Sequence, residues 1–174
     1  MFKYFSFKKD EINPKSFKFS DGCTIKLFTD KKIQLSENGK TYELKVDEKP
    51  AANNGRGEQV YESQWSDRKE TEPMSWAIAV FTENGISTAH KHKERTETYY
   101  IIEGTANVYI NEKVHTLKTG ESITIPKTSE HQVQNASNTQ NMALVVKSDP
   151  AWSFLDQHSL GKDLAPSPKP SLKL

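Results

Sequence analysis

Apolar and polar residues alternate along most of the chain in short stretches, the pattern of strands buried on one face. Ile25 and Leu27 stand between polar neighbours, and residues 76–81 form a short apolar run suited to a buried strand. Further strands are predicted at 98–102, 105–110, 113–117, 122–125, 132–135 and 142–147. No long stretch has helical periodicity, so the pattern predicts an all-β sandwich or barrel.

A hairpin is predicted at Asn38-Gly39, because the two central positions of a two-residue hairpin turn favour residues that tolerate positive φ. This turn would place Leu35 opposite Tyr42 and give the hairpin one apolar face. The segment 51–57 carries Asn and Gly residues and is predicted to be a loop.

The length of 174 residues favours one domain, which we place at 1–160 with N-terminal strands added to the barrel. A short helix is expected within 151–158, after Pro150. Residues 161–174 carry three prolines among Ser and Lys and are expected to form a flexible tail.

Composition limits the function classes. The chain has 24 basic and 23 acidic residues and a formal net charge of +1, which removes the electrostatic case for a nucleic-acid partner. No apolar run is long enough to cross a membrane, and the charged N-terminus does not resemble a secretory signal, so we expect a cytoplasmic protein. The single cysteine, Cys23, excludes a cysteine-based zinc site and is expected to be a half-buried strand residue.

Three histidines and one glutamate carry the chemistry. His90 and His92 are two residues apart, so in a strand their imidazoles point to the same side. Glu97 follows at the start of the next strand, and His131 opens a later one beyond Pro126. Neutral imidazoles and a carboxylate suit a divalent first-row metal and leave coordination positions for water or substrate. The alternative is that His90 and His92 are only the polar end of a strand.

The spacing around these residues resembles the paired motifs of the cupin superfamily. The two blocks read Gly85-x4-His90-x-His92-x4-Glu97-x6-Gly104 and Gly120-x5-Pro126-x4-His131-x3-Asn135. The resemblance covers roughly residues 76–147. It implies a double-stranded β-helix, or jelly-roll barrel, in which the equivalents of the four residues bind one metal ion. It also implies a homodimer.

Two departures from the family pattern concern turns. Four residues separate Gly85 from His90 where the family usually has five, and Thr128 stands where the family usually has Gly. Glycine often serves positive φ, so the second departure concerns the turn before His131.

A finer resemblance links residues 95–106 and the later Pro126 and His131 to the cupin part of type II mannose-6-phosphate isomerases. It implies a sugar, a sugar phosphate or a related polar metabolite as substrate and an isomerase-like proton transfer. Tyr99 shares strand parity with Glu97, so it is a candidate catalytic residue that could hydrogen-bond a substrate oxygen, or it could simply fill the barrel.

The ligand set leaves the metal open among Zn, Mn, Fe and Ni, and therefore also the reaction. Three functions stay open: a metal-dependent isomerase-like or hydrolytic enzyme, an iron-dependent dioxygenase, and a non-catalytic ligand-binding module. His115, predicted opposite Val108, and His158 are expected to be structural or surface residues. Lys91, Lys93 and Arg95 are expected on a solvated loop face, with an anion-attracting role at the barrel mouth as the alternative.

Overall fold

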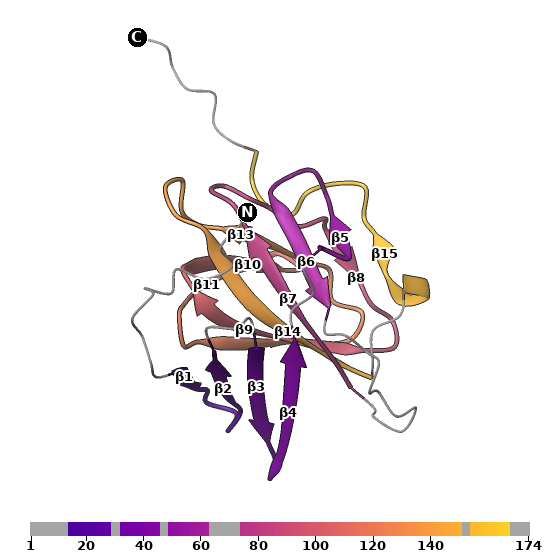
Figure 1. Ribbon diagram of the computed structural model, residues 1–174. Coiled ribbons are helices and arrows are strands. Elements are labelled where there is room, and N and C mark those ends of the chain that lie inside the picture. Colours follow the sequence, from indigo (N-terminus) through magenta and orange to yellow (C-terminus); the bar gives the residue numbers. More distant parts are fainter. Residues whose placement is uncertain (1–13, 29–31, 46–48, 63–73, 151–153, 168–174) are drawn as a thin grey trace.

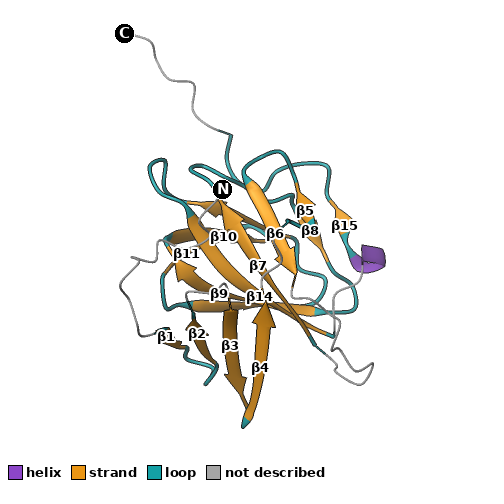
Figure 2. Cartoon of the chain, in the orientation of Figure 1, coloured by secondary structure: helices purple, strands orange, loops and turns teal. Residues whose placement is uncertain are grey.

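Strands dominate the computed structural model, which describes residues 14–28, 32–45, 49–62, 74–150 and 154–167 (Figure 1, Figure 2). They form three antiparallel sheets. The first sheet contains, in spatial order, β1 (Lys15–Lys18), β2 (Thr24–Leu27), β3 (Lys32–Glu37) and β4 (Lys40–Lys45). The second contains β11 (Lys113–Lys118), β10 (Thr105–Ile110), β13 (His131–Asn135), β8 (His90–Lys91) and β15 (His158–Ser159). The third contains β12 (Ser122–Ile125), β9 (Thr96–Glu103), β14 (Met142–Asp149), β7 (Ser75–Phe81), β6 (Glu58–Glu62) and β5 (Ala52–Asn53).

The second and third sheets face each other across a shared apolar core, as in a jelly roll. Val108 and Val133 from the second sheet belong to the same buried cluster as Phe81, Ile101 and Leu144 from the third. The predicted all-β jelly-roll class is therefore confirmed, and the interior between these sheets is where inward-facing polar residues can meet.

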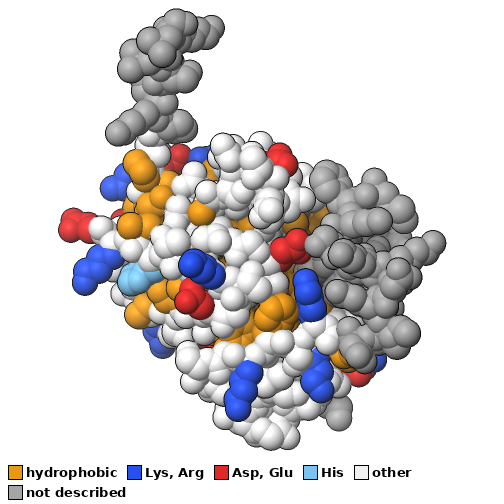
Figure 3. Space-filling view, turned by 90° about the vertical axis from the view of Figure 1, so that its left-hand side faces the viewer, with side chains coloured by type: hydrophobic (Ala, Val, Ile, Leu, Met, Phe, Trp, Pro, Cys, Tyr) orange, Lys and Arg blue, Asp and Glu red, His pale blue; other side chains and the backbone are white. Residues whose placement is uncertain are grey.

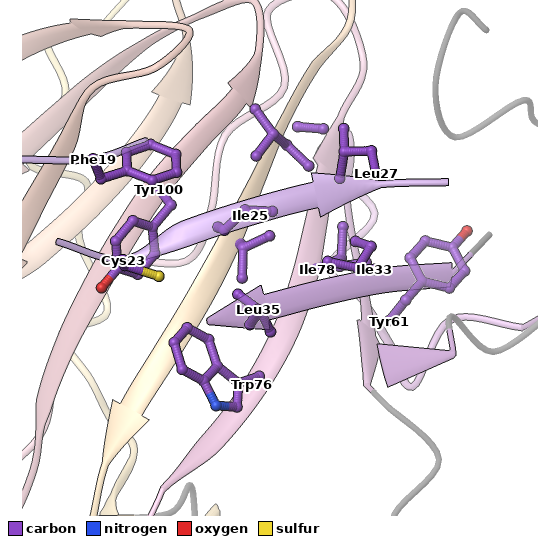
Figure 4. Close-up of a cluster of buried hydrophobic side chains, with 13 residues drawn as sticks. Phe19, Cys23, Ile25, Leu27, Ile33, Leu35, Tyr61, Trp76, Ile78 and Tyr100 are labelled. Atoms are coloured by element: carbon purple, nitrogen blue, oxygen red, sulfur yellow. The ribbon is translucent and has the colours of Figure 1, made fainter. Parts of the chain in front are cut away.

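The first sheet covers the outer face of the third sheet and creates a second core (Figure 4). Ile25 and Leu35 pack in the same cluster as Ile78 and Tyr100, and all four are buried. Strand alternation explains this arrangement, because Tyr100 points away from the barrel interior while Tyr99 and Ile101 point into it. The third sheet is thus buried on both faces, which accounts for the continuous apolar run at 76–81.

The hairpin predictions are confirmed at the level of register. Leu35 pairs with Tyr42 across a turn in which Asn38 and Gly39 have φ of 51° and 73°. Cys23 lies just before β2 and is fully buried, rather than half-buried within a strand. The predicted loop 51–57 contains the two-residue strand β5.

The C-terminal segment remains in contact with the barrel. Within the expected helix, Phe154–Asp156 form a short 3-10 helix, His158 belongs to β15, and residues 151–153 lie outside the described residues. Beyond Gly161, the backbone N–H groups of Leu164 and Ala165 donate to Gln132 Oε1 at 2.7 and 3.0 Å. The packed part of the chain therefore extends past 161, while 168–174 lie outside the described residues.

Basic and acidic side chains are interspersed on the face shown in Figure 3, with apolar atoms between them. Among the described residues, no helical segment has the length and hydropathy to span a bilayer.

Candidate metal centre

The four predicted ligands come together inside the barrel. His90 lies in β8, His92 follows that strand directly, Glu97 lies in β9 and His131 opens β13. His90 and His131 are paired residues of adjacent strands. One ligand atom from each of the four residues lies within 4.8 Å of every other. Side chains that are up to 41 positions apart in sequence thus form one cluster that could hold a metal ion.

Backbone carbonyls fix the orientation of all three imidazoles. The Nδ1 atoms of His90, His92 and His131 lie 2.7, 2.8 and 3.0 Å from the carbonyl oxygens of Thr88, Asp156 and Ser129, respectively. A carbonyl can only accept, so each Nδ1 carries the proton and donates. Each neutral ring therefore presents the lone pair of Nε2 to the centre of the cluster.

Glu97 faces two of these lone pairs. Its Oε1 lies 3.2 Å from His92 Nε2, and its Oε2 lies 3.5 Å from His131 Nε2. Within the described part of the chain, both Nε2 atoms are buried without a hydrogen-bond partner. Two lone pairs opposite a carboxylate repel it unless a metal ion or a proton lies between them. In the metal-free protein a proton shared with Glu97 would serve, and the same donor set fits a bound metal ion.

Two neighbouring hydroxyl groups hold the Glu97 carboxylate. Tyr99 donates to Oε2 at 3.1 Å, and Ser148 donates to Oε1 at 3.2 Å. Partners of this kind orient a ligand carboxylate and are part of most metal sites. Tyr99 therefore lies at the site, as predicted, but its described contact is with a ligand residue.

The pKa values of the cluster reflect burial and mutual charge. Burial, and then the nearby His131, lowers the pKa of His90 to about 4, so this ring is neutral at physiological pH. Burial alone would raise the pKa of Glu97, but the imidazoles of His131 and His92 outweigh it and hold that pKa well below its ordinary value. Burial raises the pKa of the Tyr99 hydroxyl, which stays a proton donor.

The C-terminal segment supports His92 through Asp156. In addition to the carbonyl contact, the Asp156 carboxylate accepts hydrogen bonds from the backbone N–H of Lys93 at 2.8 Å and from Arg95 Nε at 3.0 Å. Arg95 is 2% exposed, so its expected place on a solvated loop face is wrong. Its positive charge pairs with the Asp156 carboxylate.

A cavity of about 320 Å³ opens from the cluster. His90, Glu97, Tyr99 and Ser148 line it, together with Glu58 of β6. Burial and the charge of Glu97 raise the pKa of Glu58 to about 7. Sequence pattern alone does not identify Glu58, because a single glutamate after the loop 51–57 carries no motif. The one signal in the sequence is its strand parity with Val60.

The remaining histidines lie apart from the cluster. His115 pairs with Val108 across the β10–β11 hairpin, as predicted. His158 lies in β15, with its Nε2 at 3.8 Å from Asp156 Oδ1. Neither residue is in the four-residue group.

The turn before His131 keeps the geometry that glycine usually serves. Thr128 adopts φ of 65°, and its N–H donates to the carbonyl of His92 at 2.6 Å. A β-branched residue rarely adopts this conformation. The backbone requirement expected from the motif is therefore met without glycine, and the turn ties the strand of His131 to the segment of His92.

Fold and cluster together define a class: a jelly-roll barrel with three histidines and one glutamate gathered at an internal cavity. The sequence profile described as Cupin domain matches residues 77–147. This match covers the part of the chain that carries both motifs, and it confirms the resemblance to the cupin superfamily seen in them.

Known proteins resemble this chain in sequence or in fold. An uncharacterized protein of Methanocaldococcus jannaschii, MJ1618, is 29% identical over 87 residues, which cover 50% of this chain and 69% of that protein. The structure of Pac13 from Streptomyces, a nucleoside dehydratase, aligns with a TM-score of 0.55 and 17% identity over 68% of this chain and 90% of Pac13. An oxalate oxidase aligns with a TM-score of 0.50 and 23% identity over 57% of this chain and 55% of the oxidase. At these identities the solved structures establish the fold.

Proposed function

We propose that this protein is a metal-dependent enzyme that acts on a small polar molecule bound in the cavity beside the four ligands. The observation that carries the proposal is the pair of buried Nε2 atoms, on His92 and His131, that face the Glu97 carboxylate without a hydrogen-bond partner among the described residues. His90, His92, Glu97 and His131 would hold the ion. A divalent ion held there supplies Lewis acidity to a substrate oxygen or lowers the pKa of bound water.

The residues around the ion have separate tasks in this proposal. The backbone carbonyls at Thr88, Asp156 and Ser129 keep the imidazoles in the ligating tautomer. Tyr99 and Ser148 orient the carboxylate, so we assign Tyr99 as a positioning residue. Apolar side chains such as Ala77 and Val146 line the same cavity and limit the water that reaches it.

A proton-transfer reaction on a hydroxyl-rich substrate is our first candidate. The finer resemblance to type II mannose-6-phosphate isomerases points to sugars or their phosphates, and Pac13, which is similar in fold, is a nucleoside dehydratase. An iron-dependent dioxygenase is the alternative, because the same donor set also suits iron. The identity of the bound metal separates these two reactions.

Metal content tests the site. In protein purified without chelator, we expect about one metal ion per chain, measured by inductively coupled plasma mass spectrometry. His92→Ala should lose most of the metal, whereas the matched control His115→Ala should retain it, because His115 lies outside the cluster. Equal metal in both variants would contradict the assigned ligands. Iron would favour the dioxygenase, and a redox-inert metal would favour proton transfer.

Deuterium incorporation from solvent into the substrate tests the reaction class. The metal-loaded protein is incubated in D2O with a panel of free and phosphorylated sugars, and deuterium incorporation at carbon is followed by proton NMR. We expect incorporation that disappears in His92→Ala. Oxygen uptake with substrate and no exchange would replace the isomerase-like reaction with the dioxygenase.

A further inference from the structure

Glu58 stands in the cavity as a second carboxylate, separate from the metal ligands. It lies at the start of β6 and contributes to the same cavity wall as His90, Glu97 and Tyr99. Its charge reaches the site, because Glu97 raises the pKa of Glu58 and Glu58 raises the pKa of Tyr99. Removing an ionised carboxylate from water costs free energy, so a function for Glu58 would explain why it lies here.

Asn54 holds Glu58 in this position. Its amide nitrogen donates to Glu58 Oε2 at 3.1 Å and to the carbonyl of Ile86 at 2.6 Å. Its amide oxygen accepts from the backbone N–H of Arg56 at 2.7 Å and of Glu58 at 3.2 Å. One side chain thus fixes both the backbone and the carboxylate of Glu58.

Gly57 and Gly85 allow the loop 51–57 to pack closely against the segment that leads to His90. Gly57 adopts φ of +91°, and a Cβ placed there would lie 2.7 Å from Gly85 Cα. The N–H of Ile86 donates to the carbonyl of Arg56 at 3.0 Å. The loop is therefore packed rather than free, and Glu58 is preorganised beside the metal ligands.

Among the described residues, the charged side chains that line the cavity are all acidic. Its described lining contains two carboxylates, Glu58 and Glu97, and neither lysine nor arginine. The ion would balance Glu97, which leaves the charge of Glu58 exposed to whatever enters the cavity. An anionic group next to an ionised carboxylate is repelled, whereas a hydroxyl or ammonium group donates a hydrogen bond to it.

From this arrangement we infer that Glu58 contacts the substrate and selects an uncharged, hydroxyl-bearing or a cationic molecule over an anionic one. The inference rests on the proposed metal-dependent function and narrows its substrate class: free sugars, polyols or amines are favoured over sugar phosphates. Specificity here comes from a repulsive element as much as from an attractive one.

Two small metal-binding probes test the charge selection without knowledge of the substrate. Cobalt(II)-loaded protein is titrated anaerobically at pH 8 with azide, an anion, and with imidazole, which is largely uncharged at that pH, and both are followed by the cobalt d–d absorption. Glu58→Gln should lower the Kd of azide by about tenfold, because a like charge is removed, and should leave the Kd of imidazole unchanged. Glu112→Gln, at an exposed turn residue, removes the same charge elsewhere and should change neither Kd.

A second pair of variants keeps the test decisive if Glu58→Gln does not fold. Ala52 is exposed and lines the cavity, so Ala52→Lys adds a cation and Ala52→Gln is its uncharged counterpart. The lysine variant should bind azide more tightly than the glutamine variant, with equal imidazole binding.

The outcomes separate the two proposals. If cobalt does not bind the wild-type protein, the metal-dependent function fails and the inference fails with it. If cobalt binds but Glu58→Gln leaves the azide Kd unchanged, or shifts azide and imidazole equally, the charge selection is overturned while the metal site stands.

Discussion

At the scale of single residues, the four candidate ligands are oriented by hydrogen bonds to neighbouring groups, and these hydrogen bonds matter as much as the ligand atoms themselves. Each imidazole donates Nδ1–H to a backbone carbonyl, so the ring cannot turn its other nitrogen away from the centre without losing that hydrogen bond. Glu97 is held from both sides by Tyr99 and Ser148. The site is therefore arranged in the fold itself, before any ion arrives.

Glu58 leads to a prediction about stability and pH in the metal-free protein. Its pKa is raised from 4.5 to about 7, first by burial and then by the charge of Glu97. Between these two pH values the native state binds more protons than the unfolded state, so the free energy of unfolding falls as pH rises. Glu58→Gln should therefore stabilise the protein by about 1–3 kcal/mol at pH 8 and have little effect at pH 4.

Urea unfolding of the EDTA-treated protein at both pH values measures this difference, with Glu112→Gln as the control at an exposed position. A loss of stability at pH 8 would contradict the raised pKa. The expected gain would mean that the wild-type chain gives up stability to keep a carboxylate in the cavity, which is typical of functional residues.

The sequence could predict the ligand residues because they follow a compact pattern. His90, His92 and Glu97 fall within eight positions, and strand alternation alone places the first two on one side of the sheet. Glu58 and Asp156 could not be found in this way. They reach the site from the two ends of the barrel sequence, and only tertiary packing brings them to it.

At the scale of elements, the third sheet has a different partner on each face. Its inner residues build the barrel interior, and its outer residues pack against the sheet formed by β1–β4. Strand positions and register followed from alternation and turn residues, as for the hairpin at Asn38-Gly39. The docking of that hairpin on the outer face of the barrel could not be predicted, because an apolar face does not specify which surface it will cover.

This layering predicts that stability and metal binding can be separated. Leu35 is fully buried between the first and third sheets, so Leu35→Ala should lower the free energy of unfolding by about 2–5 kcal/mol. Val114→Ala is the control at a side chain that is 56% exposed and should change stability by less than about 0.5 kcal/mol. Denaturant unfolding gives both values, and metal content should be the same in both folded variants. Loss of metal in Leu35→Ala would show that the first sheet supports the site itself.

At the scale of the whole molecule, the four ligands join both sheets of the barrel. His90 and His131 belong to the second sheet, and Glu97 belongs to the third. His92 adds the C-terminal segment through its hydrogen bond to the carbonyl of Asp156. An ion bound to all four would cross-link the two sheets of the barrel and the segment that follows β8.

Such a cross-link predicts a thermal signature. A metal that binds only the native state at a free concentration of 100 times its Kd stabilises the protein by about 2.7 kcal/mol, which for a chain of this length raises Tm by roughly 5–10 °C. Calorimetry with zinc and with EDTA should show this difference for the wild-type protein and for His115→Ala, but not for His92→Ala. An equal rise in His92→Ala would contradict the assignment of His92 as a ligand. No rise in the wild-type protein would mean that the lone pairs facing Glu97 are balanced by a proton, and the catalytic proposal would then lose its physical basis.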